Sequence, residues 1–193
     1  MTESTFDSIT IIGQGDYVNR VEMALQRIKS GYGYDIINTY IKRIEEGGPP
    51  SGMKAYVNPP TFIMSHKVAF ANNDEECSII WCASCIAHDS YHSMLYHKYA
   101  EENNIDPYNK YLSVPANIWT GTNIEINCMN HQKKVINSIG GPSYIVNHII
   151  NYLDGLDGKY HEKVVWDTKI DIPGLSTNPP IPICLFDDGL PDL

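Results

Sequence analysis

The chain has 193 residues, 42% hydrophobic and 19% charged, a composition typical of a globular protein that forms one domain around its own core. It carries 23 acidic and 14 basic residues, a formal net charge of −9, which would repel the phosphate backbone of a nucleic acid. No apolar run approaches the roughly 20 residues that span a bilayer. We therefore expect no nucleic-acid partner and no membrane partner.

The N-terminal sequence MTESTFDSITIIGQGD lacks the basic segment, apolar core and cleavage site of a secretory signal. A cytoplasmic location is therefore expected. An odd number of cysteines in such a chain predicts free thiols rather than a disulfide framework. The five cysteines are Cys77, Cys82, Cys85, Cys128 and Cys184.

The first third of the chain predicts a helical hairpin. Residues 18–30 place apolar side chains three and four positions apart, as on one face of a helix, and residues 34–46 repeat this pattern. The sequence Gly-Tyr-Gly at 31–33 separates the two helices. Two short strands, 53–57 and 61–66, are expected next, because both are rich in β-branched and aromatic residues and two prolines lie between them.

The remainder of the chain predicts three helices and a tail. The longest helix, 78–102, contains no glycine or proline, and further helices are expected at 123–138 and 143–156. The segment 171–193 carries five prolines and several acidic residues, and we expect it to be extended over the domain or disordered. The predicted organisation is a single domain over 1–170, followed by the Pro-rich acidic C-terminal segment 171–193.

One stretch of the long helix, WCASCIAHDSYHSMLYH at 81–97, concentrates residues that could do chemistry. Cys82 and Cys85 have the spacing of a redox dithiol, but such a pair opens a helix, whereas this pair is expected inside one. One zinc site made of both cysteines, His88 and His92 is excluded. The residues from Cys82 to His92 rise ~15 Å along a helix, and zinc ligands lie within about 2.3 Å of the ion.

His88 and His92 form a different pattern. They are four residues apart, so on a helix they project from one face about one turn apart, and two imidazoles can then share a metal ion. Asp89 follows the first histidine, where a carboxylate could act on a water beside the metal. This H-D-x-x-H sequence resembles the H-E-x-x-H motif of zincin metallopeptidases, with aspartate in place of glutamate.

The resemblance implies an α+β, zincin-like fold, mostly helical with a small edge sheet, in which strand 61–66 borders the cleft and pairs with an extended substrate. It also implies a third metal ligand from a later helix. The segment TNIEINCMNHQ at 122–132 offers Glu125, with Cys128 and Gln132 on the same helical face.

The activity implied by the resemblance is metal-dependent hydrolysis. One zinc ion held by His88, His92 and Glu125 would activate a water, with Asp89 as the general base. The substrate would be a peptide or another small amide. Aspartate is one methylene shorter than glutamate, and its carboxylate could stop short of that water. A catalytically silent zincin-like module, which binds metal or a partner, is therefore an alternative.

A second alternative is the HD superfamily of metal-dependent phosphohydrolases, which carry a His-Asp doublet on a helix. His88, Asp89, His92 and His97 match a spacing found in that family, and His66 is the candidate for its upstream histidine. That fold is all-α, however, and a strongly acidic chain is a poor host for phosphate.

Purely structural interpretations remain open for each candidate. The histidines could be buried and satisfied by backbone groups, and Asp89 could be a solvated or capping carboxylate. Residues 122–125 have the spacing of a capping box, in which Glu125 would reach back to the helix start. The oligomeric state is not predicted. Three later residues could donate a hydrogen bond to an oxyanion: Tyr144, His148 and Tyr160.

Overall fold

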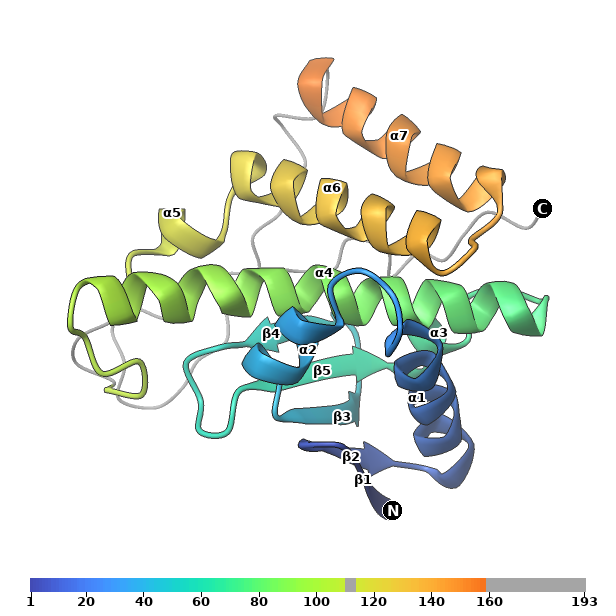
Figure 1. The fold of residues 1–193 in the computed structure, drawn as a ribbon, viewed down its shortest axis with the longest axis horizontal. Helices are drawn as coiled ribbons and strands as arrows, with labels where there is room; N and C mark the ends of the chain where they lie inside the picture. Colours follow the sequence, from blue (N-terminus) through green and yellow to red (C-terminus); the bar gives the residue numbers. More distant parts are fainter. Residues whose placement is uncertain (110–113, 159–193) are drawn as a thin grey trace.

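The structure, a computed structural model, describes residues 1–109 and 114–158 of the chain. Tyr160, Cys184 and the expected C-terminal segment 171–193 lie outside these residues. The described part is a mixed α+β fold with a five-stranded sheet and a larger share of helix (Figure 1). This agrees with the expected fold class at the level of α+β, mostly helical.

The sheet has the strand order β1-β2-β3-β5-β4. Strands β2, β3 and β5 run parallel in its centre, and β1 and β4 each pair antiparallel at an edge. The strands are β1 (Thr2–Phe6), β2 (Ile9–Gly13), β3 (Arg43–Gly47), β4 (Gly52–Lys54) and β5 (Thr61–Ser65).

Helix α4 (Glu75–Glu102) is the central helix of the fold. It lies between the sheet and α6 (Thr122–Ser138), and α7 (Ser143–Gly158) packs on α6 (Figure 1). The remaining helices are α1 (Gly15–Ile28), α2 (Tyr34–Tyr40), α3 (His66–Ala69) and α5 (Ala116–Trp119). The helices expected at 78–102, 123–138 and 143–156 are confirmed with small shifts at their ends.

The central part of α4 is enclosed on every side. All residues from Ser78 to Ser90 are buried, and most of them up to Ala87 are apolar. The hydroxyl groups of Ser84 and Ser90 donate to the carbonyl oxygens of Trp81 and Ala87, 2.8 and 2.7 Å away, and so are satisfied inside the core. The helix begins after Asp74, whose carboxylate accepts from the backbone N–H of Cys77.

The predicted helical hairpin is wrong in its second half. The second helix ends at Tyr40, and Arg43–Gly47 is instead the central strand β3. Ile44 is fully buried there and pairs in register with Ile11 of β2 and Phe62 of β5. The apolar spacing of 34–46 fits a helix locally, but pairing with two neighbouring strands outweighs that local preference.

A β-hairpin at the N-terminus was not predicted from the sequence. Strands β1 and β2 pair antiparallel around Asp7 and Ser8, and Asp7 adopts a positive φ of 49°. Ile9 and Ile11 are fully buried, whereas Thr10 between them is partly exposed. This alternation, next to an Asp-Ser turn, was the available indication of a strand.

The expected edge strand is also corrected. Strand 61–66 was expected to border the cleft, but β5 lies between β3 and β4, and Thr61, Phe62 and Met64 are buried. The edge strand is β4, whose expected range of 53–57 shortens to Gly52–Lys54. Both faces of β5 are largely buried, and the sequence TFIMS suits such a position better than GMK.

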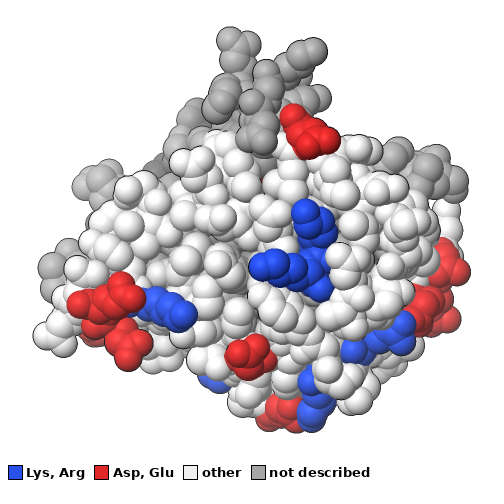
Figure 2. Space-filling view, turned by 45° about the horizontal axis from the view of Figure 1, so that its top comes forward, with Lys and Arg blue, Asp and Glu red and all other residues white. Residues whose placement is uncertain are grey.

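The surface carries few charges on the face shown in Figure 2. Lysine and arginine side chains form one small group and some scattered ones there, with no continuous basic stripe. None of the described helices is both long and apolar enough to cross a membrane. The expectations of a cytoplasmic location and of no nucleic-acid partner stay predictions.

Replacing Gly33 with alanine should destabilise the fold. Gly33 has a φ of +90°, and a Cβ there would lie 3.0 Å from Cε1 of the buried His131 ring. The strained backbone and the contact should together lower the free energy of unfolding by about 1–3 kcal/mol, measured by urea denaturation. Gly48→Ala is the matched control, because a Cβ at Gly48 meets nothing within 4 Å. Equal stability of the two variants would contradict this explanation.

Candidate metal centre

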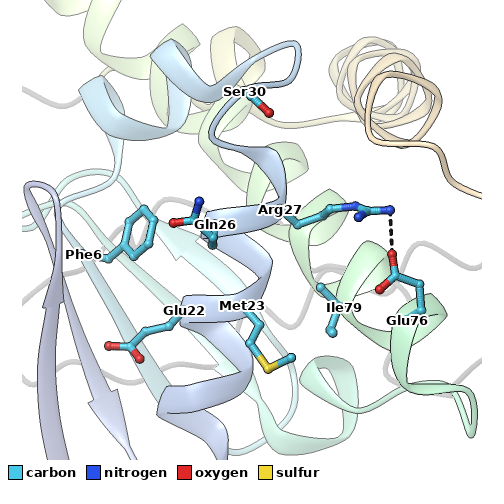
Figure 3. Close-up of a pocket in the computed structure, with 8 residues that line it drawn as sticks. All are labelled: Phe6, Glu22, Met23, Gln26, Arg27, Ser30, Glu76 and Ile79. Carbon is cyan, nitrogen blue, oxygen red and sulfur yellow. Dashed lines mark ion pairs between the residues drawn. The ribbon is translucent and has the colours of Figure 1, made fainter.

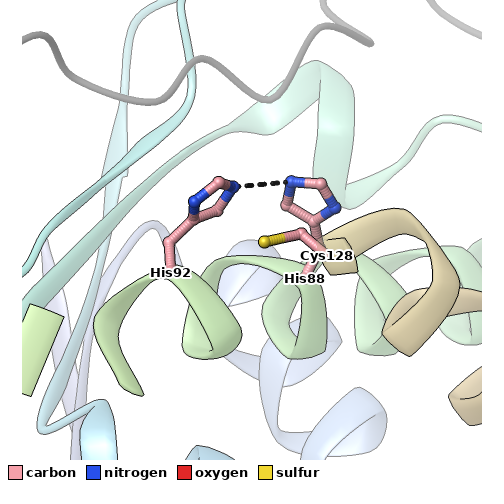
Figure 4. Close-up of side chains that lie close together, drawn as sticks. All are labelled: His88, His92 and Cys128. Atoms are coloured by element: carbon pink, nitrogen blue, oxygen red, sulfur yellow. Dashed lines mark hydrogen bonds between the residues drawn. The ribbon is translucent and has the colours of Figure 1, made fainter. Parts of the chain in front are cut away.

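Two imidazole rings face each other on the buried surface of α4. His88 and His92 are each 1% exposed, and their Nε2 atoms lie 3.1 Å apart (Figure 4). The spacing of four residues puts both rings on one side of the helix, as the sequence predicted. What two nitrogen atoms at this distance can do depends on which of them carries a proton.

The proton on His92 is placed by a backbone carbonyl. Its Nδ1 lies 2.7 Å from the carbonyl oxygen of Trp119, the last residue of α5. A carbonyl oxygen only accepts hydrogen bonds, so Nδ1 carries the proton. In the neutral ring, Nε2 is then an unprotonated acceptor that points toward His88.

The proton on His88 is placed by the side chain of Gln132 on α6. His88 Nδ1 lies 3.2 Å from Gln132 Oε1, and Gln132 is fully buried. The amide nitrogen of Gln132 donates to Ser84 Oγ at 3.0 Å, and that hydroxyl in turn donates to the carbonyl of Trp81. This chain of donors fixes the amide orientation, so Oε1 faces His88 and Nδ1 is the protonated nitrogen.

Glu125 of α6, the third ligand that the resemblance implies, lies against both rings. Its Oε1 lies 3.3 Å from His88 Nε2, and its Oε2 lies 3.4 Å from His92 Nε2. Burial by itself would raise the pKa of this carboxyl, whereas the charge and hydrogen bonds of the two facing imidazoles, in their protonated form, lower it well below its usual range. The capping-box interpretation is wrong, because Gly121 is the N-cap of α6 and no side chain caps it.

Cys128 adds a fourth donor, one helical turn after Glu125. Its Sγ and ligand atoms of His88 and His92 all lie within 4.8 Å of one another (Figure 4). Burial, followed by the nearby carboxylates of Glu125 and Asp89, raises the pKa of the Cys128 thiol well above its ordinary value. The sequence placed Cys128 on the correct helical face but gave no reason to count it as a ligand.

Asp89, the residue predicted as the general base, is fully buried. It follows His88 directly on α4, and its charge reaches the Cys128 thiol on α6. The side chain therefore lies inside the core near the cluster. This placement contradicts the interpretation of Asp89 as a solvated surface carboxylate.

The two other histidines of the phosphohydrolase alternative lie elsewhere. His66 has its Nδ1 2.9 Å from Glu46 Oε1, and its ring stacks on Phe70. The ring of His97 stacks on Tyr40. Neither belongs to the cluster that could hold a metal ion among the described residues, and the five-stranded sheet is foreign to an all-α fold.

The candidate dithiol lies in the interior of α4. Cys82 and Cys85 are both fully buried, and Cys82 comes well after the helix start at Glu75. Burial raises the pKa of Cys82 far above its ordinary value, the opposite of what activates a redox thiol. The structure thus disfavours the dithiol interpretation.

The late residues considered as oxyanion donors are not gathered at the cluster. The hydroxyl of Tyr144 accepts a hydrogen bond from Asn72, before the start of α4. The ring of His148 packs edge-on against Trp81. Neither observation assigns a catalytic contact to these side chains.

A separate surface hollow lies beside α1 (Figure 3). Phe6, Met23 and Ile79 give it an apolar part, and an ion pair of 2.6 Å between Arg27 and Glu76 lies at one side. Its lining contains no histidine and no cysteine, so it is not a second metal-binding cluster.

The donor set fits a metal ion. Two imidazole nitrogens with protonated Nδ1 atoms, a carboxylate and a thiol are the ligand types that bind zinc and related divalent ions. The buried His88, His92 and Cys128 group could hold such an ion, and Glu125 faces the same two nitrogen atoms. Known proteins add nothing to this, because no protein-family model, curated protein sequence or solved structure matches the chain.

The role of Gln132 is testable through metal affinity. Gln132→Leu removes the acceptor that holds the His88 ring and its proton in place, so zinc affinity should fall 10- to 100-fold in calorimetric titration. Gln26→Leu makes the same chemical change on the exposed side of α1 and should leave the affinity unchanged. Equal zinc affinities for the two variants would show that Gln132 does not support metal binding through His88.

Proposed function

We propose that this protein is a zinc-dependent hydrolase of the zincin type, which acts on a peptide or another amide bond. His88, His92 and Glu125 would be the metal ligands, and Asp89 would be the general base. The main support for the proposal is that three hydrogen-bond acceptors lie next to one another, namely the two Nε2 atoms and the Glu125 carboxylate. The two Nε2 atoms lie 3.1 Å apart, and each lies 3.3–3.4 Å from a carboxylate oxygen of Glu125.

Such a group, with both imidazoles neutral, needs a positive charge between its acceptors. With both Nδ1 protons committed to Gln132 and Trp119, the neutral imidazoles have no hydrogen to donate to each other or to Glu125. Buried acceptors that face one another are costly, and a buried carboxylate needs a positive partner. A divalent cation satisfies all three groups at once, and the mixture of nitrogen and oxygen donors favours zinc.

The order of elements supports the zincin type. A short antiparallel edge strand, β4, and a buried strand, β5, precede α4, which carries His88 and His92, and α6 supplies Glu125 later. The resemblance implies an edge strand and a third ligand from a later helix, and β4 holds the edge position in place of β5. An extended peptide would pair with such an edge. Tyr56, just after β4, contacts the ring of Trp119, whose carbonyl holds His92.

The division of tasks follows from the residues. A bound zinc ion would lower the pKa of a water and polarise the substrate carbonyl. The carboxylate of Asp89 would take the proton from the attacking water and pass it to the leaving amine.

The zinc content of purified protein tests the ligand set. We expect about one equivalent in the wild type by elemental analysis, and loss of it in His92→Ala and in the isosteric Glu125→Gln. His66→Gln is the control, because His66 lies outside the cluster and is half exposed. A wild-type protein that takes up no zinc from solution would overturn the proposal.

The role of Asp89 needs a separate experiment, because a metal-binding module without activity would give the same zinc content. Asp89→Asn should keep the zinc and lower hydrolysis of a mixed peptide library by about 100-fold or more, as expected for loss of a general base. If instead the wild type is inactive and Asp89→Glu gains hydrolysis, the protein is the catalytically silent module.

A further inference from the structure

We infer that Cys128 is a fourth protein ligand, so that the metal rests in a closed site of two histidines, one glutamate and one cysteine. This inference rests on the proposed function for the presence of the metal. It adds that the resting site is latent, because the coordination position needed for hydrolysis is held by the protein's own thiolate.

The position of Cys128 on α6 supports its role as a metal ligand. It lies three residues after Glu125, so the two side chains project from the same face of α6 toward α4. The Sγ atom and the ligand nitrogens of both histidines lie within 4.8 Å of one another. Donors on one tetrahedral zinc ion are roughly 3.3–3.7 Å apart, so a side-chain shift of about 1 Å would bring the sulfur into the coordination sphere.

The side chains around Cys128 also support its role as a metal ligand. A buried cysteine that only fills space lies among apolar side chains. Cys128 is fully buried, its Sγ lies within 4.8 Å of the ligand atoms of both histidines, and the carboxylates of Glu125 and Asp89 are near enough for their charge to act on the thiol. Among these groups a thiolate bound to a cation is the arrangement in which the sulfur is fully satisfied.

The number of protein ligands determines whether the metal can bind a substrate or a water. Structural zinc sites use four protein ligands, whereas catalytic zinc sites use three and keep one position open. With Cys128 bound, the site belongs to the closed class, although the other three ligands are those of a hydrolase. A substrate or water can enter only after the sulfur leaves and regains the proton that it released to solvent on binding.

Removal of the thiol should therefore have two opposite effects. Cys128→Ala should weaken zinc binding by about 10- to 100-fold, because one ligand is lost. The same variant, at saturating zinc, should hydrolyse peptides faster than the wild type. A thiol that only packs against its neighbours would give neither the loss of affinity nor the gain of activity.

The direct test is the absorption spectrum of the cobalt-substituted protein. A cobalt ion bound by a thiolate has an intense charge-transfer band in the near ultraviolet, and one bound only by nitrogen and oxygen lacks it. We expect this band in the wild type and in Cys82→Ala, which removes a buried thiol outside the cluster. It should be absent from Cys128→Ala and from Cys128→Ser, while both variants still bind cobalt.

The outcomes separate this inference from the proposed function. Cobalt bound to the wild type without a thiolate band would overturn the inference and leave the ligand set of two histidines and a glutamate intact. A band that persists in Cys128→Ser would do the same. A wild type that binds no cobalt would overturn both. Because the wild type and Cys82→Ala already decide the first outcome, the test does not depend on the folding of the Cys128 variants.

Discussion

Two hydrogen bonds at the outer nitrogens of His88 and His92 determine which ring nitrogens of the candidate site can bind a cation. The Trp119 carbonyl and the Gln132 amide oxygen each accept from an Nδ1 atom, which leaves both Nε2 lone pairs directed at one another and at Glu125. If either ring carried its proton on Nε2, the group would be an ordinary buried hydrogen-bonded pair. With these tautomers it is a set of acceptors that a cation stabilises.

The fold holds these hydrogen bonds in place through α4. This helix is enclosed between the sheet and α6, so its two histidines cannot turn toward solvent. Helix α6 supplies Glu125, Cys128 and Gln132 from one face, and the end of α5 supplies the Trp119 carbonyl. A change in the packing of α6 on α4 would therefore displace three of the groups together, which ties the candidate metal centre to the stability of the core.

The sequence predicted the parts of the site that depend on helical periodicity. The spacing of His88 and His92 and the long uninterrupted helix are local features, and Glu125 was found through the resemblance to zincins. The hydrogen bond from His88 to Gln132 joins residues 44 positions apart, and no local pattern indicates it. Strand β3 was mistaken for helix because the pairing that buries Ile44 involves β2 and β5, which are distant in sequence. The edge strand was misplaced for the same reason.

The most direct measurement is a crystal structure of the zinc-loaded protein with diffraction data collected on both sides of the zinc absorption edge. If the two histidines and Glu125 bind zinc, a single strong anomalous peak is expected between the Nε2 atoms of His88 and His92, within about 2.3 Å of both and of a Glu125 oxygen. An anomalous peak at other residues, or no peak at this position in the zinc-loaded crystal, would contradict this ligand set.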